Sequence, residues 1–270
     1  MIAIHSLLTE NELADEFVAA FQARRFAEKF FYWFPLSVRA WLALCSDGAY
    51  RNYVRSRSLI AQSADDLART VSPGPLEVLS LGSGQGDKDL LLMNALRQRG
   101  VRVSYVPVDT SQALLELACQ GAMGAGLPAQ GIKADFTRPD HLAALAPAPE
   151  TPPRLVLLLG NTLGAFDPLA EARELRSLLR PHDSLIVDGE IYAAQHTVAG
   201  YDNPLTAASP GRRSSPWASP SRTVRSSSKT AWTLGSPACT RSPSTSGRPA
   251  RYEPGWAARH SPSPPESGST

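Results

Sequence analysis

A short apolar run that ends in three closely spaced glycines constrains the fold of this chain more than any other stretch. Residues 76–81 are mostly apolar, residues 82–86 read Gly-Ser-Gly-Gln-Gly, and leucine and alanine then recur at helical spacing over residues 90–96. This order predicts a strand, a tight turn and a helix. Because glycine has no Cβ, such a turn lets the backbone approach a ligand closely, and the following helix aims free N–H groups at the same place.

The spacing of the glycines decides which ligand the turn suits. They stand at Gly82, Gly84 and Gly86, and Asp87 occupies the position where a dinucleotide fingerprint, G-x-G-x-x-G, needs glycine. An anionic pyrophosphate beside Asp87 is disfavoured, which argues against an NAD-dependent oxidoreductase. The G-x-G-x-G spacing resembles the first motif of class I methyltransferases, which bind S-adenosylmethionine (SAM). A tight turn that binds no ligand remains the alternative.

An acidic residue at the end of the next predicted strand favours adenosine binding. That strand covers residues 101–108 and ends in Asp109. A carboxylate about 20 residues after the glycine turn is placed to accept hydrogen bonds from ribose hydroxyls. Asp109 is also suited to cap the helix expected around residues 114–118, and the two roles are compatible.

Three more strands complete the predicted sheet. Residues 132–134 form a short strand that ends in Asp135 and Phe136, a pair that can read adenine or can be a strand end with a core aromatic. Residues 154–159 form a continuous apolar run, typical of a strand buried on both faces, and residues 184–189 form the last strand. Four βα units predict an α/β doubly wound sheet with its ligand beyond the carboxyl ends of the strands.

The chain divides into three predicted parts. Residues 1–72 are expected to form an N-terminal helical cap, in which five consecutive aromatics at residues 30–34 either pack onto the sheet or form a wall for a substrate. Residues 73–208 form an incomplete Rossmann-like SAM-binding domain. In residues 209–270, Ser and Pro supply 26 of 62 positions, so this part is expected to be a disordered tail or an out-of-frame translation.

Composition excludes several classes of protein. The chain carries 27 basic and 25 acidic residues, and the nine basic residues after position 208 lie in low-complexity sequence, so we expect no nucleic-acid partner. Three widely spaced cysteines indicate neither a disulfide framework nor a metal site. No apolar run reaches about 20 residues, so we expect no membrane span. We expect a monomer in the cytoplasm.

The motifs together resemble the histidine-specific SAM-dependent methyltransferase family of ergothioneine synthesis. The resemblance covers about residues 28–208, in the pieces LGSGQGDK (81–88), YVPVDTS (105–111), ADF (134–136), LVLLLGNTLGAF (155–166) and GYDNPLTAA (200–208). It implies that SAM is bound by Gly82, Lys88, Asp109, Asp135 and Phe136. It also implies that Tyr201 helps to hold an amino-acid substrate.

Some positions depart from the family pattern. Ser80 stands where members usually carry Asp or Glu, and Ala165 stands where they carry a substrate-binding Asn, with Asn161 nearby but not matching. The aromatic segment matches only loosely, and Tyr32, Tyr50 and Tyr53 are the candidates there for lining a pocket. The family's C-terminal part, which contacts the substrate's imidazole, is replaced by the Ser/Pro tail.

Two functions are compatible with these motifs. The first is an N-methyltransferase that acts on an amino-acid-type amine by direct displacement at the sulfonium of SAM, without a metal. The alternative is a non-catalytic or truncated remnant that binds SAM weakly or does not fold, because a lost strand exposes a sheet edge.

Overall fold

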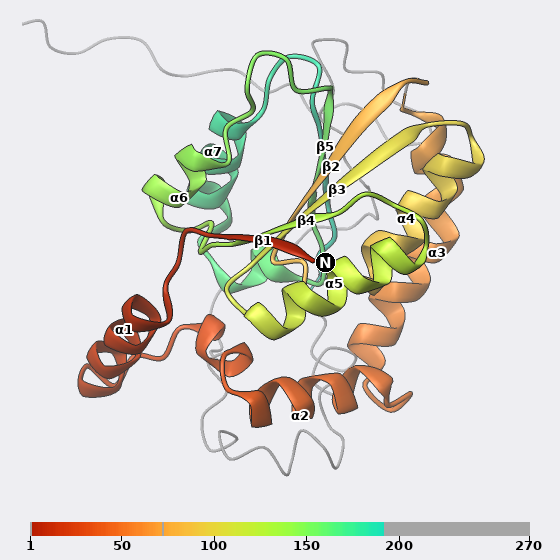
Figure 1. The fold of residues 1–270 in the computed structure, drawn as a ribbon. Coiled ribbons are helices and arrows are strands. Elements are labelled where there is room, and N and C mark those ends of the chain that lie inside the picture. Colours follow the sequence, from red (N-terminus) through yellow and green to blue (C-terminus); the bar gives the residue numbers. More distant parts are fainter. Residues whose placement is uncertain (1, 72, 192–270) are drawn as a thin grey trace, which may run out of the picture. The chain divides into compact units, whose positions relative to one another are not determined.

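The computed structural model describes residues 2–71 and 73–191, so the predicted tail at residues 209–270 lies outside the described residues. Six parallel strands form one sheet in the order β1-β4-β3-β2-β5-β6, with helices on both faces (Figure 1). The elements in chain order are β1 (Ala3–Ser6), α1 (Glu10–Gln22), the 3-10 helix η1 (Glu28–Tyr32), α2 (Pro35–Ser46), α3 (Arg51–Arg69), β2 (Pro75–Leu81), α4 (Asp87–Gln98), β3 (Arg102–Asp109), α5 (Gln112–Gly124), β4 (Gln130–Lys133), α6 (Pro139–Ala144), β5 (Arg154–Leu158), the 3-10 helix η2 (Thr162–Ala165), α7 (Pro168–Leu178) and β6 (Ser184–Val187).

Strand β2 marks the point where the strand order reverses. It pairs with β3 on one side and with β5 on the other, so the chain builds the sheet outward in both directions from β2. This arrangement confirms the predicted α/β doubly wound sheet. Ligands of such sheets lie at the carboxyl ends of the strands beside the reversal, which here are the loops after β2 and β5.

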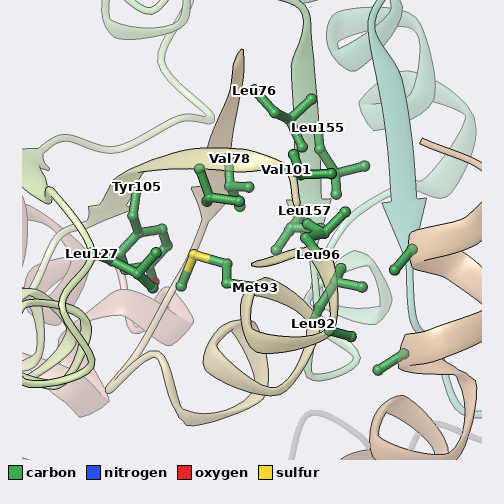
Figure 2. Close-up of a cluster of buried hydrophobic side chains, with 14 of the residues drawn as sticks. Leu76, Val78, Leu92, Met93, Leu96, Val101, Tyr105, Leu127, Leu155 and Leu157 are labelled. Atoms are coloured by element: carbon green, nitrogen blue, oxygen red, sulfur yellow. The ribbon is translucent and has the colours of Figure 1, made fainter. Parts of the chain in front are cut away.

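The side chains of β2 alternate between two cores, one on each face of the sheet. Leu76 and Val78 pack with α3, α4 and α5, whereas Leu79 and Leu81 pack with α6 and α7. Figure 2 shows part of the first core, where Leu92 and Met93 of α4 lie against the strands. Each such buried side chain contributes roughly 1.5–3 kcal/mol. The two cores therefore hold both ends of the glycine turn.

The first residues of the chain form a strand that differs from the sequence-based expectation. The sequence predicts only helices before residue 70, but β1 pairs in parallel with β4 and extends the sheet at that edge. Gly131 makes room for it, because a Cβ there would lie 3.1 Å from Cγ1 of Ile4. Four residues are too few to carry a periodic pattern, and the pairing partner lies more than 120 residues away.

Two helices are longer than expected. The sequence predicts a short helix capped at residues 63–66, but α3 runs without interruption through them. The glycine-rich stretch 121–131 is expected to be a loop, yet α5 continues to Gly124. Its Ala118 and Ala122 are fully buried, so packing against the sheet outweighs the low helix propensity of glycine. Within residues 2–71 and 73–191, no helix combines the length and the apolar character needed to cross a membrane.

Candidate functional site

A cavity of about 600 Å³ lies at the carboxyl ends of the strands, beside the reversal of strand order. One wall consists of the loops that follow β2, β3, β4 and β5, and we call it the strand wall. The opposite wall consists of residues from η1, α2 and α3, and we call it the helix wall. The volume lies within the range of about 300–1,000 Å³ that is usual for small-molecule and cofactor sites.

The glycine turn contributes bare backbone to the strand wall. Gly82 and Gly84 line the cavity, and a Cβ on Gly84 would meet nothing within 4 Å. Gly86 lies outside the lining, although the motif spacing assigns it to the cofactor. A Cβ on Gly86 would lie 3.0 Å from the Tyr105 hydroxyl and 3.1 Å from Cβ of Ala118. Gly84 therefore leaves space for a ligand, whereas Gly86 lets α4 pack closely against β3 and α5.

Asp109 stands at the end of β3 and lines the cavity, with 9% of its surface exposed. The Gly84 N–H donates to its Oδ2 at 2.9 Å, and the Ser111 N–H donates to its Oδ1 at 2.9 Å. Burial raises the pKa of Asp109, and these backbone hydrogen bonds oppose the rise. Ser111, not Asp109, is the N-cap of α5. The carboxyl is therefore fixed to the glycine turn and available to the cavity.

Asp135 and Phe136 follow β4 and line the same cavity. Oδ1 of Asp135 accepts from the N–H of Thr137 at 3.0 Å and from its hydroxyl at 2.6 Å. Burial raises the pKa of Asp135, but hydrogen bonds from Lys29 and Thr137 outweigh burial and leave that pKa below its usual value. The Phe136 ring meets Phe166 edge-on, with 5.8 Å between centroids. An ionised carboxylate therefore lies beside an aromatic ring.

Lys88 brings a positive charge into the cavity from the first turn of α4. Its ammonium donates to the Ser56 hydroxyl at 3.3 Å and lies 5.4 Å from the centre of the Tyr53 ring. A Cβ on Gly160 would lie 2.7 Å from Nζ, so the ammonium rests against the backbone of the loop after β5. Among the described residues Lys88 forms no ion pair, so an anionic group of a ligand has a partner here.

Four aromatic side chains build the helix wall: Tyr32, Trp41, Tyr50 and Tyr53. Trp41 meets Tyr32 edge-on with 5.2 Å between centroids, and Tyr50 and Tyr53 stack at 6.2 Å. The Tyr53 hydroxyl donates to Asp87 and accepts from the side chain of Gln85 at 3.2 Å. The tyrosines selected from the sequence thus line the cavity, and the Tyr53 hydroxyl contacts the end of the glycine turn.

Ser80, where the family usually has an acid, has a neighbouring carboxyl. Asp89 on α4 is buried, lines the cavity, and accepts hydrogen bonds from the hydroxyls of Tyr105 and Ser80. Burial raises the pKa of Asp89 to about 6. A carboxyl from the helix therefore lies beside the position where the strand lacks one.

Several cavity residues are not evident from the sequence. Asp188, after β6, accepts from the Gly160 N–H at 2.7 Å and the Asn161 N–H at 2.9 Å, and the Ser56 hydroxyl donates to it. Lys29 of η1 contacts Asp135. Asp188 could have been found from the sequence, because it stands at the end of a predicted strand next to β5. Tyr201, the remaining substrate candidate, lies outside the described residues.

The doubly wound sheet and the cavity at its reversal point define the class of this protein as a doubly wound α/β protein with a ligand-sized cavity at the carboxyl ends of its strands. The chain belongs to the family described as histidine-specific, SAM-dependent methyltransferases, whose sequence profile matches residues 13–203. The family suggested by the motifs is thereby confirmed.

Two curated relatives carry the same name, histidine N-alpha-methyltransferase. The protein from Mycolicibacterium smegmatis is 30% identical over 145 residues, which are 53% of this chain and 43% of that protein. The protein from Mycobacterium tuberculosis is 31% identical over 133 residues, which are 47% of this chain and 40% of that protein. The match thus spans less than half the length of each relative.

Two solved structures with a similar fold are distant from this chain in sequence. A magnesium protoporphyrin IX methyltransferase from Synechocystis PCC 6803 is 18% identical, with 58% of this chain and 68% of that one covered and a TM-score of 0.40. The PH0226 protein from Pyrococcus horikoshii OT3 is 21% identical, with 50% and 54% covered and a TM-score of 0.34. Neither likeness bears on the function of this chain.

Proposed function

We propose that this chain is a SAM-dependent N-methyltransferase that acts on the amine of histidine or a related amino acid. Family membership and the names of the two relatives support this function. The proposal depends most on one observation, namely that a single cavity contains Gly84, Lys88, Asp109, Asp135 and Phe136. These residues come from three separate stretches of the sequence and supply the groups that an adenosyl amino acid needs.

Each chemical group of SAM has a suitable residue in the cavity. Asp109 is suited to the ribose, because an ionised carboxylate accepts from hydroxyl donors. Asp135 and Phe136 are suited to adenine, whose amine donates and whose ring can lie against an aromatic face. Lys88 is suited to the carboxylate of the methionine part. The open space at Gly84 lets the ligand approach the backbone.

The helix wall is suited to the methyl acceptor. Tyr50 and Tyr53 line the cavity, and together with Tyr32 and Trp41 they offer aromatic faces to a cationic or methylated amine. We propose Tyr50 and Tyr53 as substrate-binding residues. The family resemblance adds Tyr201, which lies outside the described residues.

The reaction is a direct displacement. When bound, SAM supplies a methyl group on a positively charged sulfur. The lone pair of the neutral amine forms the new C–N bond, the C–S bond breaks with its electron pair returning to sulfur, and the amine releases a proton to solvent. The protein binds and orients both reactants and excludes water, which accounts for most of the catalysis in such a reaction.

The first experiment is calorimetric titration of the full chain with S-adenosylhomocysteine, the product of every SAM-dependent transfer. We expect a Kd on the order of micromolar. Asp109→Ala should weaken binding by at least about 100-fold, because it removes two hydrogen bonds to a charged acceptor. Asp66→Ala, at an exposed position of α3, is the matched control and should bind normally.

Mass spectrometry of histidine incubated with SAM and the protein then tests the acceptor. Methylated histidine supports the proposed function. Binding of S-adenosylhomocysteine without transfer to any amino acid would favour the non-catalytic remnant. A folded chain that does not bind S-adenosylhomocysteine contradicts both.

A further inference from the structure

The adenine-reading carboxylate of the strand wall is held by a residue from the N-terminal part of the chain. Nζ of Lys29, on η1, donates to Oδ2 of Asp135 at 2.6 Å, although 106 residues separate the two in sequence. Lys29 lines the cavity, and 17% of its side chain is exposed. An ion pair this sheltered is screened less by salt than a surface pair.

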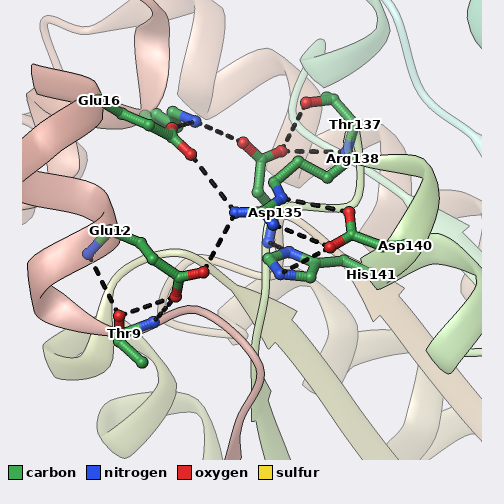
Figure 3. Close-up of polar contacts among 9 residues, drawn as sticks. Thr9, Glu12, Glu16, Asp135, Thr137, Arg138, Asp140 and His141 are labelled. Atoms are coloured by element: carbon green, nitrogen blue, oxygen red, sulfur yellow. Dashed lines mark hydrogen bonds and ion pairs between the residues drawn. The ribbon is translucent and has the colours of Figure 1, made fainter. Parts of the chain in front are cut away.

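Lys29 is itself anchored on its other side. Glu16 of α1 accepts from the same ammonium, and Glu16 also lies 3.5 Å from Nη1 of Arg138. Arg138 in turn pairs with Asp140 at 2.8 Å. Figure 3 shows Glu16 reaching from α1 toward the segment that carries Asp135 and Arg138. The ammonium therefore has a fixed position between two carboxylates.

The hydrogen bonds of Asp135 leave little room for a further donor. An ionised carboxylate offers about four acceptor positions, two on each oxygen. The Thr137 N–H and hydroxyl occupy both positions on Oδ1, and Lys29 occupies one on Oδ2. Among the contacts of the described residues, one position on Oδ2 is left. That position can accept a hydrogen bond but cannot donate one.

We propose that Lys29 is a positioning residue of the adenine subsite, which holds Asp135 so that its one remaining acceptor position selects a purine with a 6-amino group. The inference rests on the proposed function, because it takes the adenosyl part of SAM as the ligand. A 6-oxo purine presents a carbonyl oxygen to the same carboxylate and is repelled. Helix α1 and η1 thereby become part of the cofactor site.

The lowered pKa of Asp135 agrees with this assignment. Burial alone favours the protonated acid. A protonated Asp135 could donate to the carbonyl of a 6-oxo purine, which would reduce the discrimination between 6-amino and 6-oxo purines. Lys29 and Thr137 keep the carboxylate ionised, since their hydrogen bonds outweigh burial. Lys29 thus stabilises the charge of the group whose orientation it fixes.

The test compares S-adenosylhomocysteine with S-inosylhomocysteine, which carries oxygen in place of the 6-amino group. Calorimetry on the full chain gives both dissociation constants. The wild type should prefer the adenosyl compound by about 10- to 100-fold, the value of one hydrogen bond to a charged acceptor. Lys29→Met should bind the adenosyl compound about 10-fold more weakly and reduce the preference to about threefold.

Two further variants distinguish orientation of Asp135 by Lys29 from a purely structural role of Lys29 in anchoring α1. Arg138→Gln removes a charge from the same network, and its side chain does not contact Asp135, so it should keep the wild-type preference. Lys29→Gln keeps a neutral hydrogen-bond donor, so its preference for the adenosyl compound should be intermediate. If Lys29→Met does not fold, the preference of Lys29→Gln decides the test. Melting temperatures of all variants are measured in parallel.

The outcomes are distinct. An unchanged preference in Lys29→Met, or in Lys29→Gln if the former is unfolded, overturns the inference and shows that Lys29 only fastens α1. Adenosyl binding with that result leaves the proposed function intact. If the folded wild type binds neither compound, the proposed function fails and the inference fails with it.

Discussion

The two walls of the cavity are built in different ways. The strand wall consists of backbone, two carboxylates and Phe136 at the ends of buried strands, so its shape follows from the cores around Leu79 and Leu92. The helix wall consists of long aromatic side chains on helices that expose much apolar surface, with Phe34 43% and Leu36 78% exposed. The strand wall is therefore preorganised by the core, whereas the helix wall depends on its own side-chain contacts.

A few polar contacts join the walls. The Tyr53 hydroxyl donates to Asp87, the Ser56 hydroxyl donates to Asp188, and Arg55 pairs with Glu190 at 2.5 Å. Each contact links α3 to a loop or helix end beside the cavity. The contrast between the walls predicts that changes in the strand wall affect both stability and cofactor affinity, while changes in the aromatic side chains of the helix wall affect mainly the methyl acceptor.

The largest effect is expected where the strand wall meets the core. Gly86→Ala places a Cβ at φ +74° against Tyr105 and Ala118, so unfolding free energy should fall by about 2–5 kcal/mol. Gly84→Ala has a similar backbone, at φ +56°, but open space for the methyl group, and should lose only about 1–2 kcal/mol. Urea denaturation measures both. Equal losses would mean that the contacts around Gly86 relax easily.

The buried carboxyl of Asp89 should make stability depend on pH. Its pKa of about 6 in the folded protein is above the usual value of 3.8, so the folded state binds the proton more tightly. The contribution of Asp89 to the unfolding free energy should therefore fall by up to about 3 kcal/mol between pH 4 and 6 and stay constant above.

Asp89→Asn removes this titration and keeps an acceptor for the Tyr105 hydroxyl. The variant should gain stability relative to the wild type as the pH rises from 4 to 7, measured by urea denaturation at several pH values. Other carboxyls contribute equally to both proteins and cancel in the difference. A difference that does not change with pH would show that Asp89 titrates normally.

The smallest effect is expected in the helix wall. Tyr53→Phe removes the hydrogen bonds to Asp87 and from Gln85, which should cost about 1 kcal/mol of stability. Affinity for S-adenosylhomocysteine should change by less than about threefold, while KM for the acceptor rises. If Tyr53→Phe weakens S-adenosylhomocysteine binding as much as Asp109→Ala does, the proposal that the aromatic side chains of the helix wall bind the methyl acceptor and not the cofactor is wrong.

The same contrast explains what could be predicted from the sequence. Asp109, Asp135 and Phe136 could be located in one cavity, because each follows a strand directly and parallel strands end at the same edge. The position of Gly86 outside the cavity lining could not be predicted, because spacing alone does not separate a glycine that faces a cavity from one that packs against a helix.

The contacts that the sequence does not reveal join distant parts of the chain. Lys29 meets Asp135 across 106 residues, and Ser56 meets Asp188 across 132. No local sequence pattern marks Lys29 or Ser56 as a contact residue, because a single Lys or Ser on a helix is usually solvated. Strand β1 is hidden for the same reason, because its pairing with β4 and not its four residues makes it a strand.

Strand β1 also sets an order of events during synthesis. Ala3 pairs with Gln130, so the first strand leaves the ribosome well before its neighbour in the sheet exists. At about 5–20 residues per second, the wait is roughly 6–25 s. During that interval β1 has no strand to pair with, and a chaperone that recognises extended segments has time to bind there.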